Sequence, residues 1–222
     1  MQSGIPVSKR TFDLIAAVLG LIIISPLLLV LAVLVWINHG WPILFRQERA
    51  GFRGRMFHIH KFRTMTNRTA PDGRLLPDAE RLTSFGRFLR SASLDELPEL
   101  FNILRGEMSL VGPRPLFTRY LGRYTAEQMR RHDVLPGMTG WAQVNGRNAI
   151  TWEDKFRLDV WYVDHWSFRL DIRILWLTLW KSIKREGISQ PGHATMEEFE
   201  GKESIETKRQ KKETSKPPRP GR

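Results

Sequence analysis

The chain of 222 residues is long enough to form one domain with a modest hydrophobic core. A formal net charge of +12 and a sequence pI of about 10.6 indicate an anionic partner, which leaves nucleic acid, acidic lipid and phosphorylated substrates as classes. The absence of cysteine excludes disulfide bonds and thiolate chemistry. The eight tryptophans favour a membrane interface, where this side chain is enriched.

An uncharged apolar run from Leu14 to Ile37 is long enough to span a bilayer and too long for a signal peptide. Ser25-Pro26 lies in its middle, where proline removes a helical hydrogen bond and a kink is expected. Basic residues flank the run on both sides, so the positive-inside rule places both ends in the cytoplasm. Two alternatives remain open: a re-entrant helix that breaks at Ser25-Pro26 and returns, or an ordinary kinked span.

Residues 43–63 are predicted to form a β-hairpin, with strands at 43–49 and 56–63 and a turn at 51–54. His58 and His60 alternate with apolar residues and share one face, which we expect Lys61 and Arg63 to continue. Two histidines at this spacing can bind a metal, but no third ligand is nearby. A polar strand face is therefore the favoured interpretation. After a polar loop at 66–80, Thr83 is expected to cap a short helix.

The stretch from Ser93 to Pro98 sets two carboxylates, Asp95 and Glu96, side by side at the expected start of a helix that stops at Gly106. An acidic pair among cations suits a phosphate site, in which cations hold the ligand and a carboxylate attacks it or binds its metal. The alternative is a capping box formed by Ser93 and Glu96. The flanking arginines are Arg81, Arg87, Arg90, Arg105 and Arg114.

Three later segments carry further candidates. Two prolines enclose Arg114 and hold it in an extended backbone, as bidentate phosphate binding requires, although a solvated turn has the same pattern. Glycines within 136–148 let the backbone approach a ligand, so that Arg147 and Asn148 can contact phosphate or a nucleoside. The spacing matches neither a P-loop nor a dinucleotide fingerprint. A helix is predicted over 152–163, in which Asp159 is either a site residue or a salt-bridge partner.

The C-terminal part is basic. Residues 170–188 have an amphipathic pattern with tryptophans, typical of a helix in the plane of a membrane interface and equally of a helix packed on the protein core. Residues 201–222 are rich in lysine, arginine and proline and are predicted to be a disordered tail, which either contacts anionic lipid headgroups or stays solvated.

Taken together, these motifs resemble those of the bacterial sugar transferases, and among them the small, PglC-like monotopic phosphoglycosyl transferases. The resemblance covers roughly residues 8–199 and rests on several long motifs in the same order. We expect a minimal catalytic form, because larger relatives carry additional N-terminal membrane spans and another domain. The motifs are Lys9 to Asp13, Ser25-Pro26, Lys61 to Met65, Ser93 to Pro98, Gly112 to Pro115 and Pro136 to Asn148.

The resemblance implies a mainly helical α+β fold. Its parts are a re-entrant, helix-break-helix membrane hairpin over residues 1–40, a catalytic domain over 41–200 and the basic tail over 201–222. The catalytic domain contains a short β-hairpin and interfacial amphipathic helices around a small globular body. The resemblance decides between the two membrane alternatives in favour of a turning point at Ser25-Pro26. The expected location is the cytoplasmic face of the bacterial inner membrane, as a monotopic protein.

The resemblance also implies an activity: transfer of a phosphosugar from a UDP-sugar to polyprenyl phosphate, through a covalent aspartyl intermediate, with Mg²⁺ and release of UMP. Asp95 would be the nucleophile and a ligand of Mg²⁺, and Glu96 its partner as a base or a metal ligand. The residues expected to bind phosphate or substrate are Lys61, Arg63, Arg90, Arg114, Arg147, Asn148 and Asp159. The expected partners are the sugar donor, the lipid acceptor and membrane lipids, without nucleic acid.

Two departures from the family pattern bear on substrate choice: Glu99 stands where glutamine is common, and His165 where asparagine is common. A different class of function is a membrane-tethered basic adaptor that binds acidic lipid or nucleic acid, which the net charge, the apolar run and the tail would allow. It gives no role to the Asp95-Glu96 pair. A third hypothesis is a membrane phosphatase, which would form no lipid-linked sugar.

Overall fold

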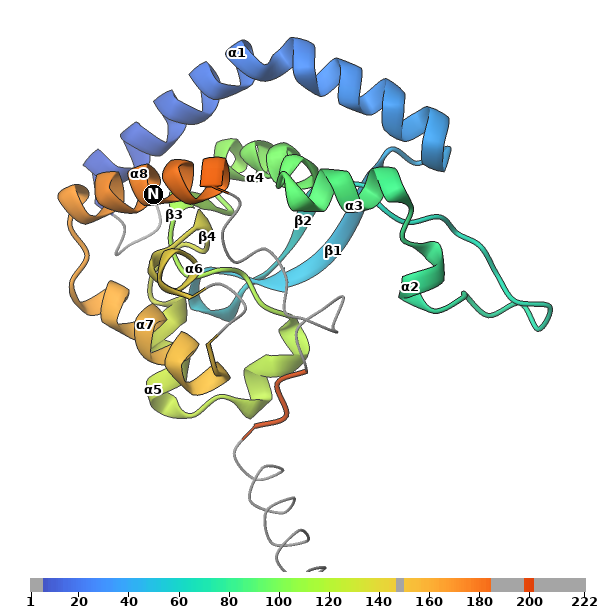
Figure 1. The fold of residues 1–222 in the computed structure, drawn as a ribbon. Helices are drawn as coiled ribbons and strands as arrows, with labels where there is room; N and C mark the ends of the chain where they lie inside the picture. The colour runs from blue at the N-terminus through green and yellow to red at the C-terminus, as the bar shows by residue number, and fades with distance from the viewer. Residues whose placement is uncertain (1–5, 147–149, 185–197, 202–222) are drawn as a thin grey trace, which may run out of the picture.

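The computed structural model describes residues 6–146, 150–184 and 198–201, and these are mainly helical, as predicted (Figure 1). Two small sheets complete the fold: β1 pairs antiparallel with β2, and β3 pairs parallel with β4. The predicted tail beyond Gly201 lies outside the described residues. The helices and strands are α1 Val7–His39, β1 Leu44–Ala50, β2 Met56–Phe62, α2 Asp78–Arg81, α3 Ser84–Ser91, α4 Leu100–Arg105, β3 Ser109–Val111, α5 Ala126–Met129, β4 Gly137–Thr139, α6 Trp141–Asn145, α7 Trp152–Asp164 and α8 Phe168–Lys184.

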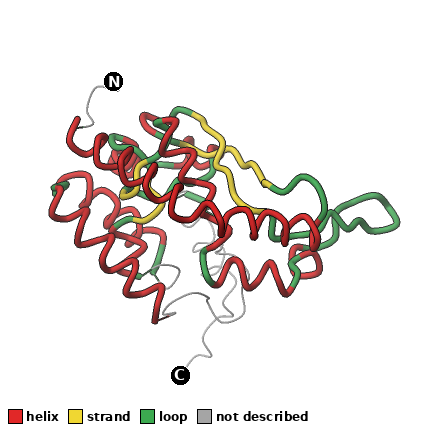
Figure 2. The backbone as a smooth tube through the Cα atoms, turned by 90° about the horizontal axis from the view of Figure 1, so that it is seen from above, coloured by secondary structure: helices red, strands yellow, loops and turns green. Residues whose placement is uncertain are grey.

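Helix α1 is continuous over its 33 residues and contains Pro26. Figure 1 shows it as an arch over the rest of the protein, and Figure 2 shows that it runs along most of the molecule's length. The Ser25 hydroxyl donates a 2.9 Å hydrogen bond to the carbonyl of Ile22, as serine does when it supports a bend. The expected break of the helix at Ser25-Pro26 is therefore wrong: the helix continues through this pair, and α1 as a whole is curved (Figure 1).

Within the described ranges, α1 is the only helix long and apolar enough to cross a bilayer. Large apolar side chains are exposed along it, including Ile23, Leu29 and Ile37. Water is a poor solvent for such a surface, so the arch requires an apolar partner. A lipid bilayer supplies one of sufficient extent.

The N-terminal end of α1 is held by buried polar contacts. The Lys9 ammonium forms an ion pair with Asp171 of α8 at 2.5 Å, and the two side chains are only 5% and 3% exposed. Lys9 also donates to the carbonyl of Val111 at 3.0 Å, and the Tyr162 hydroxyl donates to Asp171 at 2.7 Å. One turn on, the Asp13 carboxylate accepts the backbone N–H of Leu110. These bonds join α1 to β3, α7 and α8.

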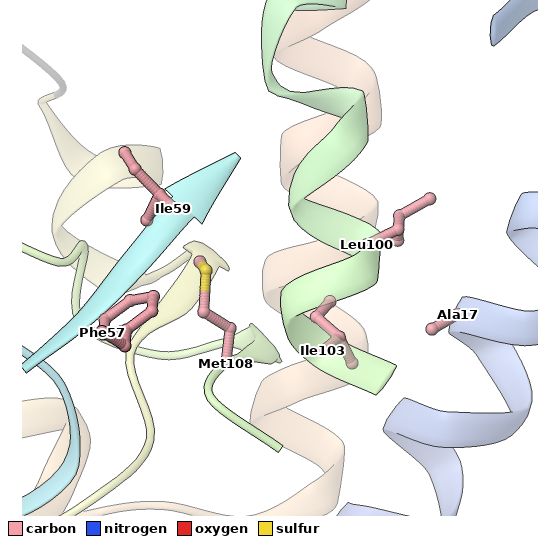
Figure 3. Close-up of a cluster of buried hydrophobic side chains, with 6 residues drawn as sticks. All are labelled: Ala17, Phe57, Ile59, Leu100, Ile103 and Met108. Carbon is pink, nitrogen blue, oxygen red and sulfur yellow. The ribbon is translucent and has the colours of Figure 1, made fainter. Parts of the chain in front are cut away.

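Apolar packing holds the rest of the inner face of α1. Leu100 and Ile103 of α4 pack against Ala17, and Phe57, Ile59 and Met108 complete the cluster (Figure 3). Nearer the C-terminal end, two further side chains of α1 pack against β2 and α3: Leu31 and Val35 contact Phe62 and Leu89. The Nε2 atom of His39 then shares a 2.9 Å hydrogen bond with the Thr83 hydroxyl. Both ends of α1 therefore rest on the same globular body.

The predicted β-hairpin is confirmed, and its register pairs Arg46 with His60 and Phe45 with Lys61. Side chains alternate between the faces of a strand. Lys61 and Arg63 therefore lie on the face opposite to His58 and His60, and the expectation that all four share one face is wrong. This alternation places two groups of cations on opposite sides of the hairpin.

The segment between α3 and α4 differs in part from the prediction. Thr83 caps α3 as expected, because its hydroxyl accepts the backbone N–H of Gly86 at 2.9 Å. Ser93 makes no capping bond and has a left-handed backbone with φ of 55°, so the capping box is wrong. The acidic pair lies instead on a 3₁₀ turn, Leu94–Glu99, that leads directly into α4. Gly106 ends α4 with φ of 82°, as predicted.

Helix α8 packs on the protein core with one face, as one of the two interpretations predicts, while its position in a membrane interface stays a prediction. Ile174 and Asp171 are buried against the protein, whereas Trp176 and Leu179 are 66% and 62% exposed. In Figure 1, α8 lies on the side of the molecule that α1 covers. An exposed apolar stripe on this side adds to the surface that α1 presents.

Replacement of Lys9 by methionine is expected to lower the free energy of unfolding by about 3–5 kcal/mol, because Asp171 would remain buried without a cation. Thermal unfolding in detergent, followed by circular dichroism, measures the change. Lys181→Met removes a lysine of α8 that has no ion pair among the described residues, and it is expected to change little. The double variant Lys9→Met/Asp171→Leu should recover much of the loss, and a loss equal to the sum of the two single variants would contradict this account.

Candidate active site

Asp95 is the least engaged of the buried carboxylates at the predicted site. It is 8% exposed, and within the described part of the chain its side chain accepts no hydrogen bond. Burial raises the pKa of Asp95, and Glu96 adds to the effect, while Lys61, Arg90 and Arg114 oppose it. The oxygens of Asp95 are therefore available for a bond to a ligand, in an environment where cations surround them.

Glu96 is fully engaged. Its carboxylate accepts a 2.5 Å hydrogen bond from the Lys61 ammonium and two hydrogen bonds from the Arg114 guanidinium. Burial alone would raise the pKa of Glu96, but Arg114 and Lys61 outweigh burial and hold the pKa far below its usual range. Glu96 thus stays ionised at neutral pH and links β2 to the segment after β3.

Glu99 is a third acidic residue of the site. It is 3% exposed, and its carboxylate lies 3.2 Å from the Lys61 ammonium. The pKa of Glu99 is raised to about 7, mainly by burial and also by Glu96, while Lys61 and Arg114 oppose the rise. One lysine therefore serves two carboxylates, and the farther one is on the border of protonation at neutral pH. In the sequence, Glu99 is recognisable only as a departure from the family pattern and not as a residue of the site.

Arg114 is held rigidly, as its two flanking prolines predict, and close backbone packing explains how. A Cβ added to Gly137 would lie 2.1 Å from the backbone nitrogen of Gly112, and one on Gly140 would lie 2.1 Å from the Gly112 carbonyl oxygen. These glycines therefore bring the β4 segment against the residues before Arg114. The structure thus shows a packing role for these two glycines, and the approach of a ligand to this segment stays a prediction.

Asp159 is connected to Arg114 through Arg131. Its carboxylate forms a buried ion pair with Arg131 at 2.8 Å, and Arg131 also donates a 2.8 Å hydrogen bond to the carbonyl of Arg114. Of the two roles that the sequence left open for Asp159, the structure places it as a salt-bridge partner. Its influence on the acidic pair passes through the backbone of Arg114.

The remaining predicted site residues do not all lie at the site. Arg90 lies near Asp95, where its charge lowers the pKa of that carboxyl, and its Nε donates to the Thr64 hydroxyl at 3.0 Å. Arg63 lies elsewhere: it is 8% exposed, and its guanidinium donates to the carbonyls of Met65 and Trp41. Arg63 therefore holds the connection between α1 and the hairpin. Arg147 and Asn148 lie outside the described residues.

Two further cations near the site, Arg49 and Lys155, are not evident from the sequence. The Arg49 guanidinium lies 3.8 Å from the centre of the Phe117 ring, and burial together with Arg114 lowers the pKa of Arg49 to about 10, against the opposing charge of Glu99. Burial likewise lowers the pKa of Lys155 to about 8. The strand alternation of β1 is the one signal that would have found Arg49, because residues 45, 47 and 49 share a face with Lys61.

A metal ion at this site would need ligand atoms from the substrate as well as from the protein. Among the described residues no three side chains of the metal-binding types come together. Glu96 and Glu99 are already bound to cations, which leaves Asp95 as the carboxylate with free oxygens. Magnesium in phosphate sites is commonly bound by one or two carboxylates together with the phosphates of the substrate. The residues present fit that kind of site.

The chemistry available here is that of phosphoryl groups. A buried carboxylate with free oxygens stands among Lys61, Arg90 and Arg114, and these cations reduce the repulsion between a carboxylate and an anionic phosphate. The arrangement suits attack of Asp95 on phosphorus better than proton transfer by Glu96, because Glu96 is a weak base while both of its cations remain bound.

Comparison with known proteins gives consistent results. Residues 5–185 match the model of a family described as bacterial sugar transferase. An uncharacterized sugar transferase, EpsL, of Bacillus subtilis (strain 168) is 54% identical over 193 residues, which are 87% of this chain and 96% of that protein.

Two longer relatives have more specific names. Undecaprenyl-phosphate glucose phosphotransferase of Komagataeibacter xylinus is 44% identical over 205 residues, which are 82% of this chain and 36% of the relative. Undecaprenyl-phosphate galactose phosphotransferase of Salmonella typhimurium is 39% identical over 196 residues, which are 81% of this chain and 41% of the relative. The chain therefore spans well under half of these two proteins.

We expect Glu99 to titrate near pH 7 while Glu96 stays ionised through the same range. Selective ¹³C labelling of glutamate carboxyl groups, with NMR spectra recorded between pH 5 and 9, measures both. Lys61→Met is expected to raise the pKa of Glu99 further, because the ammonium favours the ionised carboxylate. Arg105→Met serves as the control, since Arg105 is not among the charges that act on Glu99. Titration of Glu99 at the ordinary glutamate value would contradict the burial argument.

Proposed function

Because the chain belongs to the bacterial sugar transferase family, we propose that it transfers a phosphosugar from a UDP-sugar to a polyprenyl phosphate such as undecaprenyl phosphate. The names of two relatives support this reaction, because each name combines undecaprenyl phosphate with the phosphotransfer of a sugar. One of those names specifies glucose and the other galactose, so the sugar of this chain stays open. The product would be a lipid-linked sugar, as formed in the first membrane step of glycoconjugate synthesis.

One observation carries the proposal: the buried Asp95 carboxylate accepts no hydrogen bond from the described residues, although three cations lie close enough to shift its pKa. A structural carboxylate at this depth is normally bonded. One that is left free among cations suits a nucleophile for an anionic phosphate. The adaptor hypothesis offers no reason for such an arrangement.

We infer that the reaction proceeds in two displacements at one phosphorus. In the first, an Asp95 oxygen forms a bond to the sugar-bearing phosphorus of the donor, and the bond from that phosphorus to the bridging oxygen breaks. The bridging oxygen leaves with UMP. In the second, a phosphate oxygen of the polyprenyl phosphate attacks the same phosphorus, and the bond to Asp95 breaks, which regenerates the carboxylate.

The other residues of the site bind and orient. Glu96 fixes Lys61 and Arg114 in position, and these two cations with Arg90 hold the donor's diphosphate. Glu96 is better suited to this role than to that of a base, because its pKa is held low. Asp95 together with the donor's phosphates would hold Mg²⁺, which when bound neutralises the charge of the leaving phosphate.

The packing of α1 supports a re-entrant path through one leaflet. Lys9 at one end and Val35 at the other both contact the same globular body. A helix that crosses a bilayer would place its two ends on opposite sides, which this body cannot reach at once. We therefore propose that residues 1–40 form a bent membrane anchor and that residues 41–200 lie on the cytoplasmic face of the inner membrane. The exposed apolar stripe of α8 would face the same interface.

Asp95→Asn is expected to abolish formation of the covalent intermediate, because an amide is a far weaker nucleophile than a carboxylate. Purified protein in detergent is incubated with Mg²⁺ and a panel of UDP-sugars without lipid, and intact-protein mass spectrometry detects a mass gain of one sugar phosphate. The parent protein should gain this mass on Asp95.

Asp72→Asn, a change of the same kind in an exposed loop, should leave the adduct in place. An adduct that forms equally in Asp95→Asn would rule out the proposed nucleophile. Release of UMP only when polyprenyl phosphate is present, with no adduct at any time, would favour direct transfer instead.

The re-entrant path predicts that both ends of α1 are accessible from the cytoplasm. The chain has no cysteine, so Ser8→Cys and Asn38→Cys each introduce a single thiol at an exposed position. A membrane-impermeant maleimide should label both variants in inverted membrane vesicles and neither in intact cells whose outer membrane is permeabilised. Labelling of the two positions from opposite sides would show that α1 spans the bilayer.

A further inference from the structure

A second group of cations lies on the face of the hairpin opposite to Lys61. There β1, β2 and the end of α4 enclose an open hollow of about 580 Å³. Its polar lining consists of Arg46, His58, His60, Arg105 and Glu107, and we call it the hairpin hollow. None of these residues is among the charges that act on Asp95, Glu96 or Glu99. The hollow therefore lies apart from the charges that mainly set the pKa values of the candidate active site.

The two arginines of the hairpin hollow have no partner among the described residues. Arg46 and Arg105 are exposed, and neither forms an ion pair or a side-chain hydrogen bond there. The cations of the candidate active site differ, since Lys61 and Arg114 are bound to Glu96. Two guanidinium groups that line one hollow and form no ion pair with its carboxylate, Glu107, in the described structure suit a phosphate group, for which arginine has the matching geometry.

Glu107 offsets only one of the two arginine charges of this site. Its carboxylate accepts a 2.6 Å hydrogen bond from the Asn102 amide and forms no ion pair with either arginine of the hollow in the described structure. Asn102 also bonds the carbonyl of His58 and the backbone N–H of His60, so one buried amide organises the back wall. The hollow is thus a fixed feature of the fold with an unpaired positive charge at its mouth.

The surroundings of the hollow indicate a ligand that also has an apolar part. Phe101 is 45% exposed and lies one helical turn before Arg105, on the same face of α4. Met56 in the lining is also largely exposed. The opposite face of α4 packs against α1 through Leu100 and Ile103, and Figure 1 shows α4 directly beneath the arch. An exposed apolar side chain beside free arginines, next to the proposed membrane anchor, is a combination that a soluble phosphate does not require.

We propose that the hairpin hollow binds the phosphate headgroup of an anionic membrane lipid, with Arg46 and Arg105 on the phosphate and Phe101 against the start of the acyl chain. This rests on the proposed membrane placement of α1, and it adds a lipid site apart from the one used in catalysis. A bound lipid would connect the hairpin to the leaflet on the side away from Lys61. It would thereby fix the tilt of the domain, and with it the depth of the acidic pair below the headgroups.

Calorimetric titration of the full chain in detergent micelles tests the proposal, with protein-free micelles as the blank. Three probes separate the parts of the ligand: dioctanoyl phosphatidylglycerol, dioctanoylglycerol, which lacks the phosphate, and inorganic phosphate, which lacks the chains. The variant is Arg46→Gln/Arg105→Gln. The control is Arg68→Gln/Arg74→Gln, which removes the same charge from the exposed loop over 66–80.

The parent protein should bind the phosphatidylglycerol saturably, and the variant should bind it at least tenfold more weakly, while the control changes less than twofold. Equal affinity in parent and variant, or an equal loss in variant and control, would overturn the site. Inorganic phosphate that binds as tightly as the lipid would overturn the lipid assignment.

Formation of the sugar-phosphate adduct in detergent should be unchanged in the Arg46→Gln/Arg105→Gln variant, because neither residue belongs to the catalytic cluster. A failure of the proposed enzymatic function would appear in the parent protein as a missing adduct together with no release of UMP when polyprenyl phosphate is added. The lipid titration would be unaffected by that failure, so the two proposals can be tested separately.

Discussion

The buried ion pair between Lys9 and Asp171 is the contact on which the arrangement of the whole molecule depends. It joins the first turn of the apolar helix to the last helix of the described structure, residues that are far apart in the sequence. Removing both charges from water is costly, and the pair persists because Val111 and Tyr162 complete its hydrogen bonds. With this end fixed, the packing of Ala17 on α4 determines how the arch lies above the 3₁₀ turn that carries the acidic pair.

A second ionic contact organises the site below the arch. Glu96 joins Lys61 from the hairpin to Arg114 from the segment after β3, and in doing so it gives up its own reactivity. Its neighbour Asp95 is left without such partners and keeps free oxygens. Two adjacent carboxylates thereby acquire different properties from their surroundings alone, one fixed as an anchor and the other open to a ligand.

The sequence predicts local features well where one residue decides them. The Thr83 cap, the stop at Gly106 and the rigidity of Arg114 between two prolines are of this kind. Prediction from the sequence fails where the role of a side chain depends on residues that are distant in the chain. Arg63 has the composition of a phosphate ligand, but three-dimensional packing turns it towards the carbonyls near Trp41. Similarly, the role of Glu96 as an anchor and that of Arg49 near Glu99 require knowledge of which strand face meets the 3₁₀ turn.

The close contact of Gly112 with Gly137 and Gly140 has a consequence for mutational scanning of this chain. A methyl group on Gly137 or Gly140 would push apart the two segments whose contact fixes the backbone before Arg114. Such variants would displace the backbone of the site and would score as inactive for a reason of packing alone. A scan interpreted by activity alone would then extend the apparent binding pocket into the protein interior. Paired readings of abundance and activity at these positions would separate the scaffold from the chemistry.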